Sequence, residues 1–216
     1  MAAAGATAGD FGKSRRSSEL RASSHGRSLL VAESVGGYTC VLCRSWLLCI
    51  RTEMAFLTFR QLDRICQLNV GQDITAERYL RPDEPYLQDH FPRFPVMPGV
   101  LMLETMYQTA FWLIYATDDF KHSVVSLREA RNVKYSGFVE PEQSLVVHCE
   151  LIKRDGPISK LKAEGQVDGR VAVSGRLVLE SFNLSEREPD YPHTDAYLRR
   201  KMREHFATLC EFEAVD

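Results

Sequence analysis

The sequence predicts an α+β fold in which an antiparallel sheet of about six strands wraps around one long central helix. Residues 98–116 are apolar on nearly every side of a helix, which is typical of a helix that is buried all round. About 18 residues make a helix about 27 Å long. The flanking segments alternate apolar and polar residues between short turns, as consecutive antiparallel strands do. A sheet around the helix is what can bury it in a small protein.

Two strands are expected before the helix and four after it. A short helix or turn at 59–65 leads into the first strand, and Gly71-Gln72 separates that strand from the second. Prolines at 92, 95 and 98 keep the loop before the helix extended and stiff. Asp168-Gly169 is a tight hairpin turn that favours positive φ. The expected strands are about 65–70, 74–80, 123–133, 144–154, 159–167 and 171–182.

This domain is expected to span residues 54–182, preceded by an extension of different character. Residues 1–28 are rich in Ala, Gly, Ser and Arg, so we expect 1–53 to be mostly disordered. A targeting leader, or a start codon placed ahead of Met54, are alternatives for the same segment. The Cys40-x-x-Cys43 pair has no second pair beside it, which is a weak metal signal, and no metal is expected.

Residues 183–216 are expected to form a linker and a C-terminal amphipathic helix. The stretch 186–193 is polar with two prolines, and Thr194 can cap a helix. Leu198, Met202, Phe206 and Leu209 then recur at helical spacing. This stripe predicts a helix that docks on the domain or on a neighbouring subunit, with carrier or partner binding as the alternative.

Composition limits the class of protein. The chain has 216 residues, 44% of them hydrophobic, which suits one globular domain with a core. A net charge of −2 argues against a nucleic-acid binder. Six sparse cysteines do not form a disulfide framework, and no apolar run has the length of a membrane span. We therefore expect a cytoplasmic protein.

Glu104 is the first candidate catalytic residue. A carboxylate in the middle of an apolar helix is costly to bury and needs a reason. Desolvation should raise its pKa and favour the protonated form, which is what a general acid requires. A helix rolled so that Glu104 meets water or a structural partner is the alternative.

His90 and the helix start complete the candidate site. His90 lies in the proline-rich loop, which must turn back at Pro98-Gly99 to begin the helix, so it can lie beside the first turns. A neutral imidazole is a competent base near neutral pH. The first turn of a helix has unpaired N–H groups, and Gly99 lets an acyl group approach them. These parts suit abstraction of a proton next to a carbonyl, with loss of a group from the β position or addition to it.

Residues 90–108, His90-Phe-Pro-x-x-Pro-Val-Met-Pro-Gly-Val-Leu-x-Leu-Glu-x-Met-x-Gln, resemble the signature of 3-hydroxyacyl-acyl carrier protein dehydratases of the FabZ/FabA type, which have the hotdog fold. Shorter segments extend the resemblance over about 59–181: Leu62-Asp-Arg-Ile, Asn132-Val-Lys-Tyr, Pro141 and Val167-Asp-Gly-Arg-Val.

The resemblance implies a role for each matched residue. His90 would be the base that removes the α-proton. Glu104, contributed by the partner subunit of a dimer, would be the acid that protonates the departing β-hydroxyl. The Gly99 amide would polarise the thioester carbonyl, and the Val96 carbonyl would orient His90. Gln108, one turn after Glu104, would position it by a hydrogen bond.

The resemblance also implies the partners. Substrates would arrive on the phosphopantetheine arm of acyl carrier protein, and the enzyme would be a homodimer or a trimer of dimers. No metal or organic cofactor is implied. Arg93, Arg131 and Lys134 are candidates for contact with the acidic carrier, although ordinary solvated cations explain each of them as well.

Two departures from the family pattern keep rival functions open. Arg93 and Phe94 stand where the family has a small residue and then often Arg, and a bulky pair there could narrow the acyl tunnel. The N-terminal His-Arg-x-Pro-Phe element lacks its proline. A non-catalytic acyl- or carrier-binding relative and a thioesterase of the same fold are the alternatives. His90 at this spacing argues against the thioesterase.

Overall fold

The structure is a computed structural model that describes residues 59–91, 93–188 and 193–210. All of them belong to one compact unit, Leu47–Asp216. The expectations for residues 1–53, including Cys40 and Cys43, lie outside the described residues, as does Pro92.

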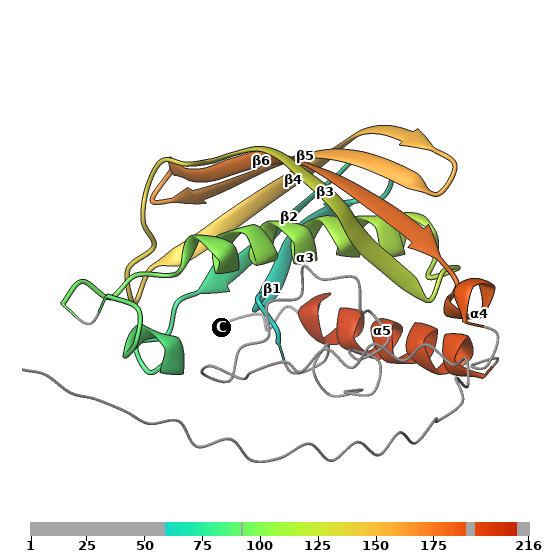
Figure 1. The fold of residues 1–216 in the computed structure, drawn as a ribbon, viewed down its shortest axis with the longest axis horizontal. Coiled ribbons are helices and arrows are strands. Elements are labelled where there is room, and N and C mark those ends of the chain that lie inside the picture. Colours follow the sequence, from blue (N-terminus) through green and yellow to red (C-terminus); the bar gives the residue numbers. More distant parts are fainter. Residues whose placement is uncertain (1–58, 92, 189–192, 211–216) are drawn as a thin grey trace, which may run out of the picture. The chain divides into compact units, whose positions relative to one another are not determined.

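Six antiparallel strands form a single sheet in the order β1-β2-β4-β5-β6-β3. Each predicted strand is present, with ends within one or two residues of the prediction. The fold class is therefore confirmed, and Figure 1 shows the strands curving over the central helix. The strands are β1 Arg64–Asn69, β2 Asp73–Tyr79, β3 Val124–Tyr135, β4 Ser144–Asp155, β5 Ile158–Val167 and β6 Arg170–Phe182.

The central helix α3, Gly99–Thr117, lies along the sheet and forms the core with it. Its middle is buried on all sides, and Met106, Leu113 and Ile114 have no exposed surface. Two tyrosines in this apolar environment keep hydrogen bonds: Tyr107 Oη donates to Val125 O at 2.8 Å, and Tyr115 Oη donates to Ser123 O at 3.0 Å. Buried hydroxyls satisfied in this way cost little.

The segment before β1 differs from the prediction. A short helix or turn was expected at 59–65, but residues 59–62 are irregular coil and β1 begins at Arg64. Gln61 and Leu62 are both buried. We call residues 59–62 the entry segment. Its path is set by hydrogen bonds to a distant part of the chain, as described below, so local spacing could not reveal it.

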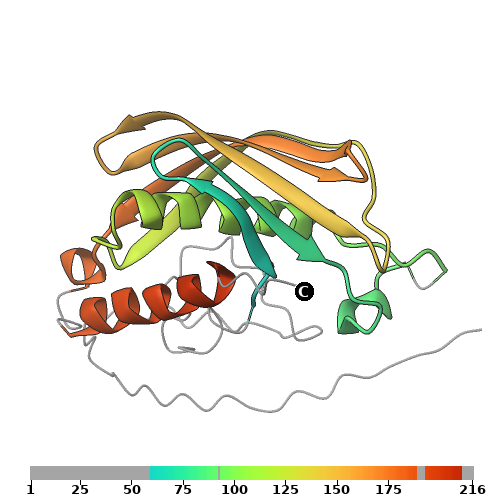
Figure 2. The same cartoon turned by 180° about the vertical axis from the view of Figure 1, so that it is seen from behind.

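The C-terminal helix α5, Thr194–Cys210, lies along α3 on the side away from the sheet (Figures 1 and 2). Trp112 of α3 contacts His205 and Phe206 of α5, with ring centroids 5.2 and 5.6 Å apart. Docking of this helix on its own domain is therefore confirmed. A one-turn helix, α4 Leu184–Arg187, occupies the start of the expected linker.

Asp195 joins the first turn of α5 to the rest of the domain. Its Oδ1 accepts hydrogen bonds from Ser123 Oγ at 2.5 Å and from the Leu184 amide at 2.8 Å. Its Oδ2 accepts one from Ser185 Oγ at 2.5 Å. Burial disfavours the charge of Asp195, but these bonds outweigh it and hold the pKa of the carboxyl below its ordinary value. The start of α5 is thus fixed by a satisfied buried network.

Among the described residues, no helix is both long and apolar enough to cross a membrane.

Candidate active site

His90 lies in the loop between the short 3₁₀ helix η1, Pro85–Leu87, and α3. Its amide donates to Tyr86 O at 2.9 Å, which closes a turn, and its ring lies 4.5 Å from that of Phe91. Phe91 has φ 52°, a left-handed conformation that is uncommon for an aromatic residue and is often found at functional sites. The half-buried histidine is therefore presented by a tight, specific backbone turn.

The start of α3 has no side-chain cap, and its N-cap residue is Pro98. The N–H groups in the first turn of an α-helix have no hydrogen-bond acceptor within the helix. A Cβ on Gly99 would lie 3.1 Å from Cε1 of Tyr135 at the end of β3. Tyr135 therefore gives a steric reason for a glycine at position 99, in addition to the acyl approach that the sequence suggested.

Glu104 lies in the second turn of α3, at the edge of the buried part of the helix. Burial raises the pKa of its carboxyl above the ordinary value of 4.5, and a hydrogen bond from Gln108 partly offsets this rise. The direction agrees with the expectation from the sequence. A carboxyl with this tendency is suited to donating a proton, as a general acid does.

The side-chain amide of Gln108 is held on both sides. Its Nε2 donates to Glu104 Oε1 and to Phe59 O, both at 2.9 Å, and its Oε1 accepts from the Gln61 amide at 2.8 Å. Both N–H bonds are thereby used, and the amide orientation is set by the backbone of the entry segment. The predicted contact between Gln108 and Glu104 is present in the structure.

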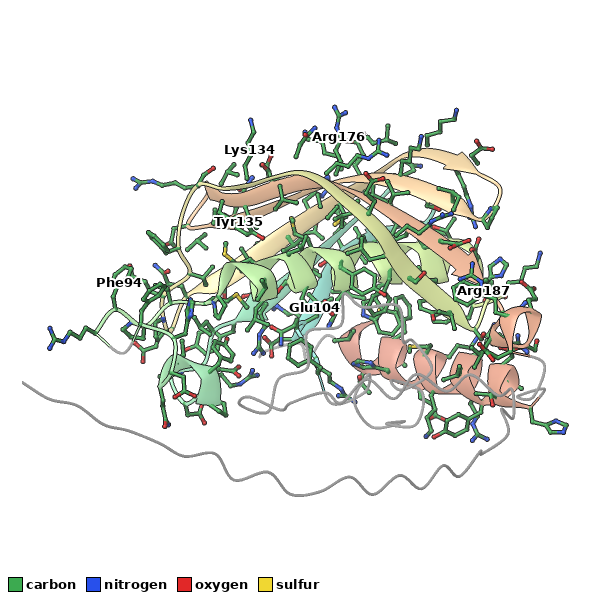
Figure 3. The ribbon with its side chains drawn as sticks, viewed as in Figure 1. Phe94, Glu104, Lys134, Tyr135, Arg176 and Arg187 are labelled. Atoms are coloured by element: carbon green, nitrogen blue, oxygen red, sulfur yellow. The ribbon has the colours of Figure 1, made fainter. Side chains whose placement is uncertain are left out.

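Exposed aromatic side chains gather around the start of α3. Phe94 contacts Phe138 edge to face, with centroids 5.5 Å apart, and Tyr135 contacts the position of Gly99. Figure 3 shows Tyr135 above the first turn of α3 and Phe94 in the loop before it. Phe138 is 62% exposed. These three aromatic side chains therefore leave apolar surface exposed in this part of the molecule.

The other predicted residues are less closely tied to the site. Val96 is buried, and among the described residues no hydrogen bond joins its carbonyl to the His90 ring, so that role stays a prediction. Arg131 is paired with Glu129 at 2.6 Å, which weakens its case as a carrier contact. Arg93 is exposed, and exposed Lys134 points away from α3 (Figure 3).

His90 and Glu104 are not hydrogen-bonded to each other within the described part of one chain. His90 contacts Tyr86 and Phe91, whereas Glu104 contacts Gln108. The described residues also contain no group of three or more His, Cys, Asp or Glu side chains arranged to hold a metal ion.

Sequence reasoning missed three contributors to this site. Tyr135 approaches Gly99 from a strand 36 positions later, and the entry segment reaches Gln108 across 47 positions. The sequence of 59–62 carries no local signal for this role, because the contacts that set its path are made with Gln108. The left-handed backbone of Phe91 could not be predicted from the sequence, because the position is occupied by neither glycine nor asparagine.

Comparison with known proteins gives a consistent family. The FabA-like domain model matches residues 55–176. A 3-hydroxyacyl-[acyl-carrier-protein] dehydratase FabZ from Lactococcus lactis subsp. cremoris is 40% identical over 119 residues, which are 55% of this chain and 82% of that protein. The FabZ of Streptococcus thermophilus is 38% identical over 117 residues, 54% of this chain and 82% of that protein.

A solved structure has the same fold at low identity. The dehydratase heterocomplex ApeI:P from Xenorhabdus doucetiae aligns with a TM-score of 0.51 and 18% identity, over 62% of this chain and 90% of that chain. The family match spans strands β1 to β5, the first half of β6, the central helix and every candidate site residue, and the chain belongs to the FabA-like family.

Proposed function

We propose that the protein dehydrates 3-hydroxyacyl thioesters of acyl carrier protein to trans-2-enoyl thioesters, in fatty-acid or related acyl-chain synthesis. The observation that carries this proposal is Glu104, a carboxyl with a raised pKa whose Oε1 is held by Gln108 in an apolar helix. The dehydratase names of relatives at up to 40% identity support the same reaction.

The reaction needs one base and one acid. His90 takes the proton from the α-carbon, and the electron pair left behind forms the Cα–Cβ double bond. The Cβ–O bond breaks, and Glu104 gives its proton to the leaving hydroxyl so that water departs. The thioester carbonyl, which carries charge in the transition state, is polarised by the Gly99 amide at the uncapped helix start. Val96 O orients the His90 ring.

The partner is acyl carrier protein, whose phosphopantetheine arm brings the acyl chain to the site. The exposed aromatic group around Gly99 suits the apolar acyl chain, and Lys134 lies one residue before Tyr135 where an acidic carrier can meet it. The proposal includes a homodimer, or a trimer of dimers, in the cytoplasm. It requires no metal or organic cofactor, because proton transfer and elimination use the chain's own groups.

The test is turnover of a panel of 3-hydroxyacyl carrier thioesters of rising chain length, followed by the absorbance of the enoyl product. His90→Ala and Glu104→Gln should each lower kcat by a factor of about 10² to 10⁴. The matched controls are His148→Ala and Glu150→Gln, a histidine and a glutamate on β4 outside the site, which should keep full activity.

Three outcomes of this test would count against the proposal. Full activity in both site variants would contradict the assigned roles. Release of free thiol without enoyl product would indicate a thioesterase. Tight binding of the acyl carrier thioester without any turnover would indicate a binding protein.

A further inference from the structure

We propose that the C-terminal helix α5 is a positioning element for Glu104, which acts through the entry segment and Gln108. Helix α5 lies beyond residues 55–176, the region that the family model matches. The assignment of Glu104 as the acid rests on the proposed function, whereas the mechanical link from α5 to Gln108 does not.

The first link is the amide of Gln108. It has two N–H bonds, and these go to Glu104 Oε1 and Phe59 O, while its oxygen takes the Gln61 amide. The carbonyl and the amide that hold it lie two residues apart in the entry segment, so any shift of that segment moves the amide. Glu104 Oε1 accepts this bond, so we expect the transferable proton to be on Oε2.

The second link is the packing of the entry segment against α5. Leu62 is only 5% exposed, and it lines a groove together with Arg60 and with Thr208 and Leu209 from the last turn of α5. His205 lies one turn before Leu209. Burial lowers its pKa, and the charge of Arg60 makes a smaller contribution in the same direction. Arg60 is therefore near α5, and the entry segment lies between α3 and the end of α5.

The third link is the anchoring of α5 itself. Its first turn is held by Asp195, and its middle packs through His205 and Phe206 on Trp112. Because α5 is fixed at these points, the position of Leu209 next to the entry segment is fixed as well. In the described part of the chain, residues 59–62 are irregular coil, so packing by α5 supplies the restraint that strand pairing gives elsewhere.

The test compares Leu209→Ala with Met202→Ala. Both side chains are buried in α5, at 5% and 6% exposure, but only Leu209 lines the groove with the entry segment. Both variants should lose similar thermal stability. Only Leu209→Ala should lower kcat, by about tenfold with little change in KM, because a small displacement of a catalytic group lowers the rate strongly.

A second measurement separates positioning from general loosening. The side-chain amide signal of Gln108 can be identified by its absence in Gln108→Ala. Its exchange with solvent should be at least several-fold faster in Leu209→Ala and unchanged in Met202→Ala. The volume-conserving Leu209→Met should restore both the slow exchange and kcat. If Leu209→Ala folds poorly, Leu209→Val provides the same comparison with a smaller deletion.

Equal losses of kcat and of amide protection in the Leu209 and Met202 variants would overturn the proposal, as would unchanged values in Leu209→Ala. If the wild-type protein lacks dehydratase activity, the proposed function fails. The amide exchange would still decide whether α5 positions Gln108.

Discussion

At the level of single residues, Glu104 is the proposed acid of the reaction, and its burial should make the protein less stable at high pH. Its native pKa is raised by burial, so the native state binds the proton more tightly than the unfolded state. The free energy of unfolding should therefore fall as pH rises from about 4.5 through the native pKa. Glu104→Gln removes this titration and should be more stable than the parent at pH 8, with a melting temperature about 2–4 °C higher.

The measurement is thermal unfolding of both proteins at pH 4 and pH 8, together with dehydration rates. The stability gain should shrink at pH 4, where Glu104 is mostly protonated in both states, and the dehydration rate of the variant should stay low at both pH values. A gain of the same size at both pH values would contradict the burial argument.

Gly99 can be tested through Tyr135. A Cβ at position 99 would lie 3.1 to 3.3 Å from three atoms of the Tyr135 ring, so Gly99→Ala should displace the ring or the helix start. We expect Gly99→Ala to lower kcat/KM several-fold. In a Tyr135→Ala background the same substitution should cost less, with a coupling energy of about 1 kcal/mol. Additive effects of the two substitutions would show that the contact has no influence on the site.

At the level of elements, the strands could be predicted from the regular alternation of apolar and polar residues. Segments positioned by long-range contacts could not. Buried residues occupy every second position over 145–149 in β4 and over 173–181 in β6, and the ends of both strands lie within one or two residues of the prediction. Residues 59–62 lack such a period, because their partner Gln108 is 47 positions away from Gln61. The C-terminal helix was predicted from its stripe, but His205, which is buried against Trp112, was not.

His205 makes the docking of α5 sensitive to acid. Burial and the charge of Arg60 lower its pKa from 6.5 to about 4, and its Nε2 is buried without a hydrogen-bond partner among the described residues. The unfolded state therefore binds the proton more readily, and the free energy of unfolding should fall as pH drops from about 6.5 to about 4.

The variant His205→Phe tests this dependence. It keeps an aromatic ring against Trp112 and removes the titration. Denaturant unfolding at pH 7.5 and pH 5 should show the parent losing about 1–2 kcal/mol more than the variant, after allowance for solvent screening. An identical pH dependence in both proteins would mean that His205 is charged in the folded state or accessible to water.

At the level of the whole molecule, the candidate residues could be named from their spacing in the sequence, whereas their distribution between subunits was implied only by the family resemblance. The spacing of His90, Gly99, Glu104 and Gln108 identified them together, and the Gln108–Glu104 contact is present in the structure. Within one chain, however, His90 and Glu104 belong to separate groups of contacts. Strand β3 is also at the edge of the sheet, and Asn132 within it has φ 52°. Sequence spacing within one chain cannot tell whether a second chain completes the site.

Mixing two inactive variants tests the expectation that Glu104 serves a pocket of the partner subunit. A dimer of His90→Ala with Glu104→Gln has one site without either group and one site with both. After subunit exchange, half of the molecules are such mixed dimers with one working site, so activity should return to about a quarter of the wild-type value. If both groups act in the same chain, no site in the mixture is complete and no activity returns. The control mixes each variant with the double variant, which should stay inactive because every pocket then lacks the base or the acid. Sizing of the mixture before and after exchange shows whether the restored activity belongs to the dimer.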